Sequence, residues 1–421
     1  MTKRPSDFTL PDMQRRNRRQ IVSWCLFDFA NSSYSAVIAA VVFPVYYVQV
    51  IVGDASGLGD LWWGRAISFS MAFVALTSPF LGGIADYSGR RKGFLLFYTL
   101  LCVCCVSALV LLKKGMVIEG FLLVTAANVG MEGGLVFYNA FLPEIAEREF
   151  QGRVSAWGYA IGYAGSIASL LIALPLIKSG QYNAAWLMVA VFFSLFSLPA
   201  FIFLSQGSRK GLSLRGAAIK GGNHSWTTLK AIWGRREVRR FLLAFLIYDD
   251  GINTVIVFSS IFAAATLGFG AKELVGLYMV VQVTALFGAF VMARPIDYWG
   301  PKRVVTLSLV LWSIVAVAAY VIYNKVYFWA LACCAGLGLG TVQAASRAFF
   351  AQFIPPGRES EYFGVFSLVG KSSAVAGPLL FGYVSSTFGS QRPAILAISA
   401  FFITGLLLIR GVRGGGPNIV E

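Results

Sequence analysis

Charged residues are scarce in this chain. Asp, Glu, Lys and Arg make up 13% of its 421 residues, whereas a soluble globular domain carries about a quarter. Hydrophobic residues make up 57%, and the mean hydropathy is +0.71. This composition excludes an ordinary soluble domain and indicates a protein that lies mostly within a membrane.

Residues that bind metals or act as nucleophiles are also few. His224 is the one histidine, and the six cysteines all fall in apolar segments without a histidine nearby. The cysteine-rich run at 102–105 therefore predicts ordinary packing and no zinc site. The sequence contains no Gly-x-x-x-x-Gly-Lys-[Ser/Thr] loop, which argues against a built-in ATPase. We expect no enzyme activity, no metal and no cofactor. A membrane-embedded lipid transferase is disfavoured for the same reasons.

Long apolar runs, by contrast, are abundant. A bilayer core about 30 Å thick needs about 20 mainly apolar residues per helix. Twelve stretches of this kind fit the sequence, at approximately 21–51, 62–85, 93–112, 116–141, 154–177, 184–204, 239–267, 273–293, 304–323, 326–351, 362–386 and 393–410. The first lacks a small-residue cleavage site, which predicts an uncleaved helix and not a signal peptide. The chain is therefore predicted to be an all-α membrane protein.

The basic residues gather on one side of the predicted spans. The formal net charge is +16, and Lys and Arg are concentrated in the N-terminal tail, the short loops of the same side, the segment 205–238 and the C-terminus. Short loops rich in Lys and Arg stay in the cytoplasm, so we expect both termini and this segment to be cytoplasmic. The excess charge then orients the chain and contacts anionic lipids, and no nucleic-acid partner is expected.

Five residues recur 212 positions later along the chain. Pro143, Gly152, Ser155, Gly158 and Gly165 reappear as Pro355, Gly364, Ser367, Gly370 and Gly377. Such a repeat predicts two halves of similar shape, which in a membrane protein surround a central site. The predicted organisation is a tail at 1–20, a six-helix bundle at 21–204, a linker at 205–238, a second six-helix bundle at 239–410 and a tail at 411–421.

Two loops repeat in nearly the same register. The segments Gly82–Lys92 and Ala293–Arg303 each carry an aspartate, a glycine and basic residues, and the aspartates lie 211 positions apart. Glycine permits a tight turn between helices, and an aspartate can accept hydrogen bonds from the N-terminus of a neighbouring helix. We expect a gating or conformational role for five residues, namely Asp86, Arg90, Asp297, Lys302 and Arg347.

These two loops resemble the signature loop of the major facilitator superfamily. Further segments narrow the resemblance to the UMF1 group, which includes the fungal vacuolar Atg22-like amino-acid effluxers. They are Trp24–Ser32, Tyr138–Glu144, Tyr248–Thr254 and Gln343–Arg347 with Glu361–Val365. The resemblance implies twelve transmembrane helices in two pseudo-symmetric six-helix bundles, and it implies amino-acid efflux. We expect a monomeric, multi-pass protein of the bacterial inner membrane.

A few ionisable side chains lie within the predicted spans, and such groups usually face a cavity because they are costly in lipid. In spans one, four, seven and ten, further polar residues follow at helical spacing and so lie on one face of the helix. In the superfamily that the chain resembles, these four helices line the central cavity. The residues that we expect to bind substrate or protons are Asp28, Asn31, Asn128, Glu132, Asp250, Asn253, Gln343 and Lys371.

The predicted roles follow from position and charge. Asp28 and Asp250 are each followed by an asparagine three residues later, so we expect them to face one another across the cavity. A buried carboxylate takes up a proton more readily than one in water, and Glu132, nearest to mid-span, is the candidate proton carrier. Alternatively, both have a gating or structural role, and Asp250 either bonds kinked backbone beside Gly251 or locks the two bundles together. Lys371 either neutralises an acid or binds a carboxylate group of the substrate.

The sequence therefore predicts a secondary active transporter for a small polar organic solute, such as an amino acid. It would work by alternating access, with proton coupling as a further hypothesis. The alternative is a lipid or lysolipid flippase on the same scaffold, which a mostly apolar cavity would favour. The expected partners are the solute, protons and membrane lipids. The repeat breaks at two ionisable positions, because Glu132 corresponds to Ala344 and Lys371 to Tyr159. We expect the substrate to bind there.

Overall fold

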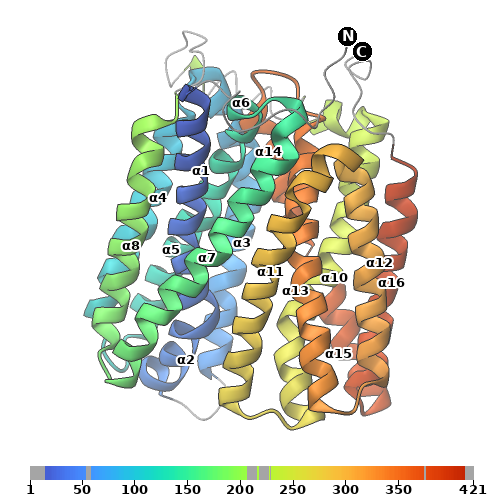
Figure 1. The fold of residues 1–421 in the computed structure, drawn as a ribbon. Coiled ribbons are helices and arrows are strands. Elements are labelled where there is room, and N and C mark those ends of the chain that lie inside the picture. Colours follow the sequence, from blue (N-terminus) through green and yellow to red (C-terminus); the bar gives the residue numbers. More distant parts are fainter. Residues whose placement is uncertain are drawn as a thin grey trace.

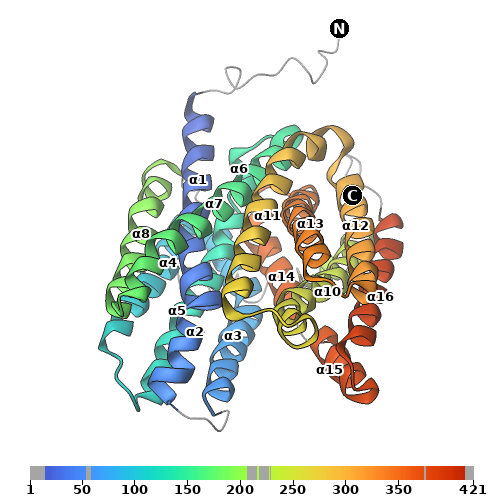
Figure 2. The ribbon, with the colours of Figure 1, turned by 60° about the horizontal axis from the view of Figure 1, so that its bottom comes forward.

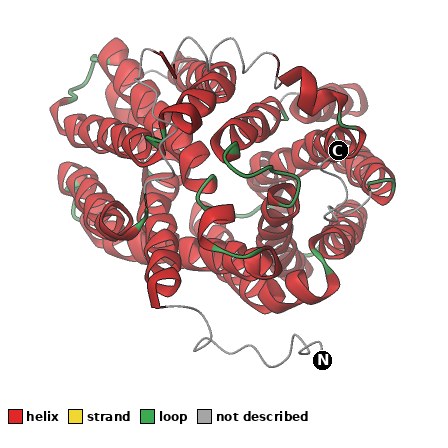
Figure 3. Cartoon of the chain, turned by 90° about the horizontal axis from the view of Figure 1, so that it is seen from above, coloured by secondary structure: helices red, strands yellow, loops and turns green. Residues whose placement is uncertain are grey.

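A computed structural model describes residues 15–53, 58–205, 216–217, 227, 229–373 and 376–412. These residues form helices joined by loops, and none of them is in a strand (Figure 3). In the described part of the chain, ten helices are long and apolar enough to cross a membrane, and a bent pair brings the number to eleven. The predicted span at 362–386 falls on two shorter helices, α14 (Glu359–Ser372) and α15 (Ala376–Phe388). The all-α, multi-span prediction is therefore confirmed, and the structure is consistent with twelve spans.

The first half of the molecule begins with a bent span. Helix α1 (Arg15–Ser33) continues into the π-helical segment η3 (Tyr34–Val41), the short α2 (Phe43–Tyr46) and the π-helical η4 (Tyr47–Val52), with a bend of 41° before α2. Pro44 in the first turn of α2 lacks a backbone donor, which favours a break in the helix there. The other long helices of this half are α3 (Leu58–Ser88), α4 (Arg91–Ala108), α5 (Val117–Asn139), α7 (Gln151–Lys178) and α8 (Tyr182–Phe203).

The second half lies beside the first (Figure 1). It contains α10 (Arg236–Leu267), α11 (Ala271–Trp299), α12 (Pro301–Val321), α13 (Lys325–Ala351), α14, α15 and α16 (Gln391–Arg410). Helix α1 begins and α16 ends on the same side of the molecule, at the top of Figure 1, which we call the terminal face. Most of the predicted linker lies outside the described residues.

Two helix pairs join the halves near the terminal face: α3 packs on α14, and α7 packs on α11 (Figures 1 and 2). Two of the recurring glycines, Gly152 and Gly364, lie where these helices cross. A side chain on Gly364 would meet the Ser78 carbonyl oxygen at 2.5 Å, and one on Gly152 would meet Ile296 and Asp297. Glycine is therefore required at both crossings, because only it lets the helices approach so closely. These two repeated glycines thus mark contacts between the halves, whereas Gly165 and Gly377 pack within a half, on Phe29 and on Asp250.

Candidate functional site

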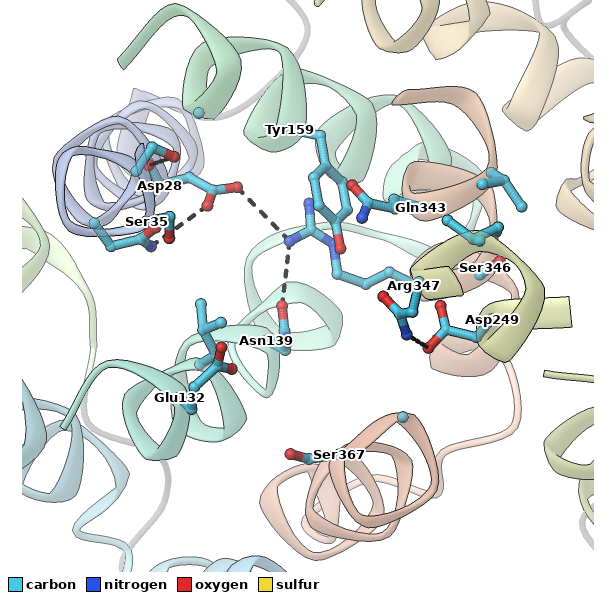
Figure 4. A pocket seen from close by; sticks show the side chains of 18 of the residues that line it. Asp28, Ser35, Glu132, Asn139, Tyr159, Asp249, Gln343, Ser346, Arg347 and Ser367 are labelled. Carbon is cyan, nitrogen blue, oxygen red and sulfur yellow. Dashed lines mark hydrogen bonds and ion pairs between the residues drawn. The ribbon is translucent and has the colours of Figure 1, made fainter. Parts of the chain in front are cut away.

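A cavity of about 390 Å³ lies between the two halves, at mid-length of the helices. Its wall comes from α1, α5 and α7 of the first half and from α10, α11, α13 and α14 of the second (Figure 4). The polar and charged residues that line it include Asp28, Asn31, Ser32, Ser35, Glu132, Asn139, Tyr159, Tyr163, Asp249, Asn253, Gln343, Ser346, Arg347 and Lys371. Of the eight predicted binding residues, the structure places six on this wall and two elsewhere.

Arg347 crosses from the second half into the first. It lies near the C-terminal end of α13 and is 2% exposed. Its Nε donates to Ser155 Oγ at 2.9 Å, and its Nη2 donates to the Ser155 carbonyl oxygen at 2.6 Å. Nη1 donates to Asn139 Oδ1 at 3.2 Å and lies 3.8 Å from Asp28 Oδ2 (Figure 4). The Asp28 contact is an ion pair that is too long for a hydrogen bond. Arg347 therefore ties α13 to α1, α5 and α7 at once.

Aromatic rings of the first half enclose the same guanidinium. Its carbon lies 4.1 Å from the ring centre of Tyr159 and 4.7 Å from that of Trp24. A side chain on Gly158 would collide with Trp24 and with Arg347 Nη2. Planar stacking and a fork of donors are properties of arginine that lysine lacks. The cage thus selects arginine by shape as well as by charge.

Replacing Arg347 with lysine is expected to reduce transport at least tenfold although the charge is kept. Lysine would lose the stacking on Tyr159 and the paired bonds to Ser155. The measurement is the initial rate of substrate uptake by proteoliposomes, with thermal unfolding as a check on folding. Arg239→Lys, at an exposed position of α10, is the matched control. Wild-type transport by the Arg347→Lys protein would show that charge alone suffices.

Glu132 and Lys371 form an ion pair across the cavity. Lys371 Nζ, on α14 of the second half, donates to Glu132 Oε2, on α5 of the first half. Their side chains keep 22% exposure for Lys371 and 16% for Glu132, so both reach the cavity. The two ionisable positions at which the sequence repeat breaks are therefore partners. This juxtaposition depends on the packing of α5 against α14, which the sequence alone did not reveal.

The predicted pairing of Asp28 with Asp250 does not occur in this structure. Both carboxylate oxygens of Asp250 accept the backbone N–H of Gly377 at 2.9 Å, where α15 begins, so Asp250 is held inside the second half. Its neighbour Asp249 faces the cavity instead, and accepts from Asn253 at 3.2 Å and from Ser373 Oγ at 2.7 Å. Asn253 lies three residues from Asp250 and four from Asp249, and both spacings share a helix face. The rotation of α10 decides between the two aspartates.

Asn128 also lies away from the cavity. Its Nδ2 donates to Ser70 Oγ at 2.7 Å, and its Oδ1 accepts from Tyr34 at 3.3 Å, within the first half. Asn128 is one helical turn from Glu132 on α5, but the partners on α3 and η3 satisfy its amide. A buried polar group with such partners is a packing feature.

A second charged cluster closes the terminal face. Arg91, 5% exposed in its side chain, pairs at 2.8 Å with Asp86, Glu144 and Glu359. The Asp86 carboxylate also accepts the backbone N–H groups of Ser360 and Glu361, at the N-terminus of α14. Two elements of the first half are thereby bound to the second half. The predicted acceptor role of Asp86 appears here as a contact between the halves.

The other repeated loop makes the corresponding contact. Asp297, at the end of α11, accepts the backbone N–H of Arg153 at 2.9 Å near the N-terminus of α7, and the Arg153 side chain lies 3.3 Å away. The basic residues selected from these two loops, Arg90 and Lys302, make no such contact in the described part of the chain. Arg90 is exposed, and Lys302 donates to the Arg410 carbonyl within the second half. The basic residue after Arg90 in the same run makes the contact, since the turn points Arg91 inward.

A second, mostly apolar cavity of about 530 Å³ adjoins the first. Ser35, Glu132, Tyr163, Tyr278, Gln282 and Gln343 line both cavities. From there the second cavity extends between α10, α11, α12, α13, α15 and α16, within the second half. The transition from polar to apolar walls therefore occurs at this shared boundary.

Comparison with known proteins identifies relatives of the whole chain. The family model described as vacuole effluxer Atg22 like matches residues 65–152 and 146–413. An uncharacterised MFS-type transporter, YxiO of Bacillus subtilis, is 29% identical over 412 residues, which cover 94% of this chain and 95% of YxiO. Autophagy-related protein 22-1 of Penicillium rubens is 24% identical over 65% of this chain, and the match spans about half (51%) of the fungal protein.

Solved structures share the fold. The human organic anion transporter MFSD10 matches with a TM-score of 0.76 at 14% identity, over 94% of this chain and all of that one. The proton:xylose symporter XylE matches with a TM-score of 0.70 at 12% identity, over 95% of each chain. The fold predicted from the two repeated loops, that of the major facilitator superfamily, is therefore confirmed.

Proposed function

The chain belongs to the vacuole effluxer Atg22-like family, and from this premise we propose that it is a secondary transporter of a small zwitterionic organic solute. Its family and fold are those of major facilitator superfamily transporters, which are not enzymes. Transport by alternating access requires a site between two halves that separate on one side at a time. The central cavity and the contacts of the terminal face fit this requirement.

The observation that carries the proposal is the Glu132–Lys371 pair within a cavity between the halves. A zwitterion offers one charge to each partner, a carboxylate to Lys371 and an ammonium group to Glu132. Binding would replace a direct link between the halves by a link through the solute. Asp249 supplies a further carboxylate on the same wall. An amino acid has the required pair of charges, and we propose amino-acid efflux as the physiological process.

Proton coupling is the second part of the proposal. Glu132, Asp28 and Asp249 are carboxylates on a cavity wall within apolar spans, which makes them the candidate proton carriers. Protonation of Glu132 would release Lys371, and protonation of Asp28 would weaken its ion pair with Arg347. Each event loosens a contact between the halves, which is how a proton gradient would drive the conformational change.

We propose that both termini are cytoplasmic, because the basic residues gather on their side. The present conformation is then closed to the cytoplasm by the contacts of Arg91 and Asp297. The protein is proposed to act as a monomer in a bacterial cytoplasmic membrane. A lysolipid flippase is the second candidate function, and the observation in its favour is the apolar cavity beside the central one.

The test is transport by the purified full-length protein in proteoliposomes. Counterflow of a panel of labelled amino acids is measured with and without a pH gradient, beside a fluorescent lysolipid. Amino-acid counterflow that responds to the gradient is the expected result. Movement of the lysolipid without movement of any amino acid would replace the leading proposal by the second candidate.

A further inference from the structure

A carrier of purely polar solutes would not need an apolar cavity beside its binding site, yet the second half contains one. Protein interiors are packed densely, with few voids larger than a water molecule. This cavity holds about 530 Å³, and its walls away from the boundary include Phe258, Trp312, Leu339 and Phe381. Water is a poor occupant of apolar space, because it needs polar partners. Such a volume calls for an apolar occupant.

The cavity extends mainly within the second half, and the first half can be compared with it at corresponding positions. There Trp186, fully buried, packs on Phe43 at 5.1 Å and on Tyr46 at 5.5 Å between ring centres. The 212-residue register places Ile398 where the first half has Trp186, since 186 plus 212 is 398, and Ile398 lines the cavity. Likewise Ala335, on the cavity wall, corresponds to Leu123. At these two positions the smaller residue of the second half adds to the space, whereas Trp312 and Phe381 stand where the first half has the smaller Leu100 and Ser169.

The boundary with the central cavity is polar and already satisfied. Tyr163 donates to Gln343 Oε1 at 2.6 Å, and Gln282 donates to the Tyr278 oxygen at 3.1 Å. These four side chains stand where the polar wall ends, and Glu132 lines both cavities. A ligand whose charged head meets Glu132 and Lys371 therefore has the apolar cavity directly beside its head.

Size limits the class of ligand. An apolar cavity of about 150 Å³ accommodates one benzene molecule, so this one has room for roughly three such groups. A single amino-acid side chain would fill a minor part of it. We propose that the transported solute is an amphipathic zwitterion: its charged head binds Glu132 and Lys371, and its apolar arm occupies the cavity of the second half, so that a longer arm binds more tightly. This inference rests on the proposed function and narrows its substrate class.

The experiment keeps the head constant and lengthens the arm. Binding of L-2-aminobutyric, L-2-aminooctanoic and L-2-aminododecanoic acids to the full-length protein in nanodiscs is measured by calorimetry. Lysophosphatidylethanolamine with a 12-carbon chain is measured in the same way as the lipid ligand. Each additional methylene that enters the cavity should raise affinity about fourfold. Phenylalanine at Ala335 would occupy the cavity, so Ala335→Phe should lower the affinity for the 12-carbon amino acid at least tenfold and leave that for the short one within about twofold.

Two variants and one control separate the outcomes. Ala319→Phe fills the same cavity from α12, in case Ala335→Phe does not fold. Ala330→Phe places the same ring on the exposed face of α13 and should bind as the wild type does.

Affinity that does not rise with arm length, while amino acids are still transported, would overturn this inference and leave the proposed function intact. If the 12-carbon amino acid bound equally well to the wild type and to the variants with a filled cavity, the inference would also be overturned, because the ligand would then be partitioning into lipid. If the lysolipid were the one ligand that bound, the apolar subsite would be supported and its ligand would be a lipid. No binding of any zwitterion would refute the proposed function as well.

Discussion

Replacing Arg91 with glutamine is expected to open the terminal face and to stop transport. The guanidinium compensates three carboxylates, Asp86, Glu144 and Glu359, and its Nε donates to Ser360 at 2.6 Å across the interface between the halves. Breaking one buried ion pair costs about 3–5 kcal/mol because the partner charge is left uncompensated. Here the remaining acids would also repel one another, and the repulsion would separate α3 and the short helix α6 (Leu142–Ile145), which carries Glu144, from α14.

Cys25 provides a natural reporter of this opening. It lies on α1, is 2% exposed, and is one helical turn from Asp28. Alkylation of Cys25 by a polar maleimide, followed by peptide mass spectrometry, should become at least tenfold faster in Arg91→Gln. The neighbouring exposed residue supplies the matched control, Arg90→Gln, which should react at the wild-type rate. Removing one acid together with the arginine, as in Arg91→Gln with Glu359→Gln, should restore part of the closure. An unchanged alkylation rate would show that the cluster does not hold the terminal face closed.

Replacing Glu132 with glutamine is expected to abolish transport driven by a pH gradient and to spare solute exchange. Glutamine has the shape of protonated glutamate but carries no proton through the cycle, so the gradient can no longer act through this position. Exchange needs only the binding of solute, and Lys371 remains available to a carboxylate group. Gradient-driven uptake and counterflow are measured on the same proteoliposomes at several pH values.

Glu132→Asp is the control for this experiment, because it keeps a titratable group on the same wall. It should keep the pH dependence, with a lower rate because the shorter side chain reaches less far towards Lys371. If Glu132→Gln transports with the pH dependence of the wild type, Glu132 is not the proton carrier. The carboxylates of Asp28 and Asp249 would then be the remaining candidates on the cavity wall.

Several features of the site were predictable because they depend on local chemistry. The recurring glycines predicted two equivalent halves, and Gly152 and Gly364 do lie at the helix crossings between them. The paired loops predicted aspartates that accept from a helix N-terminus, as Asp86 and Asp297 do. The helical spacing of polar residues predicted that Asp28 and Asn31 face the cavity from the first span, and both line it.

Other features required the packing of one helix against another. Asp249 and Asp250 are adjacent, and only the rotation of α10 turns one to the cavity and the other to the backbone of Gly377. Asn128 lies one helical turn from Glu132, a spacing that would suit a cavity residue, but its side-chain amide donates to Ser70 on α3. The segment 362–386 likewise reads as one apolar run, and the structure describes two helices in it, α14 and α15.

The sequence by itself determined that this is an all-α membrane protein of two similar halves, with a few charged positions within its spans. Composition, periodicity and repeated glycines suffice for this, because bilayer thickness and backbone geometry act on each segment separately. Only the tertiary structure decided which charges meet. Glu132 pairs with Lys371, 239 residues away, and Arg347 enters an aromatic cage on the opposite half. The same holds for the apolar cavity, since side chains of several helices line it, and no single segment contains it.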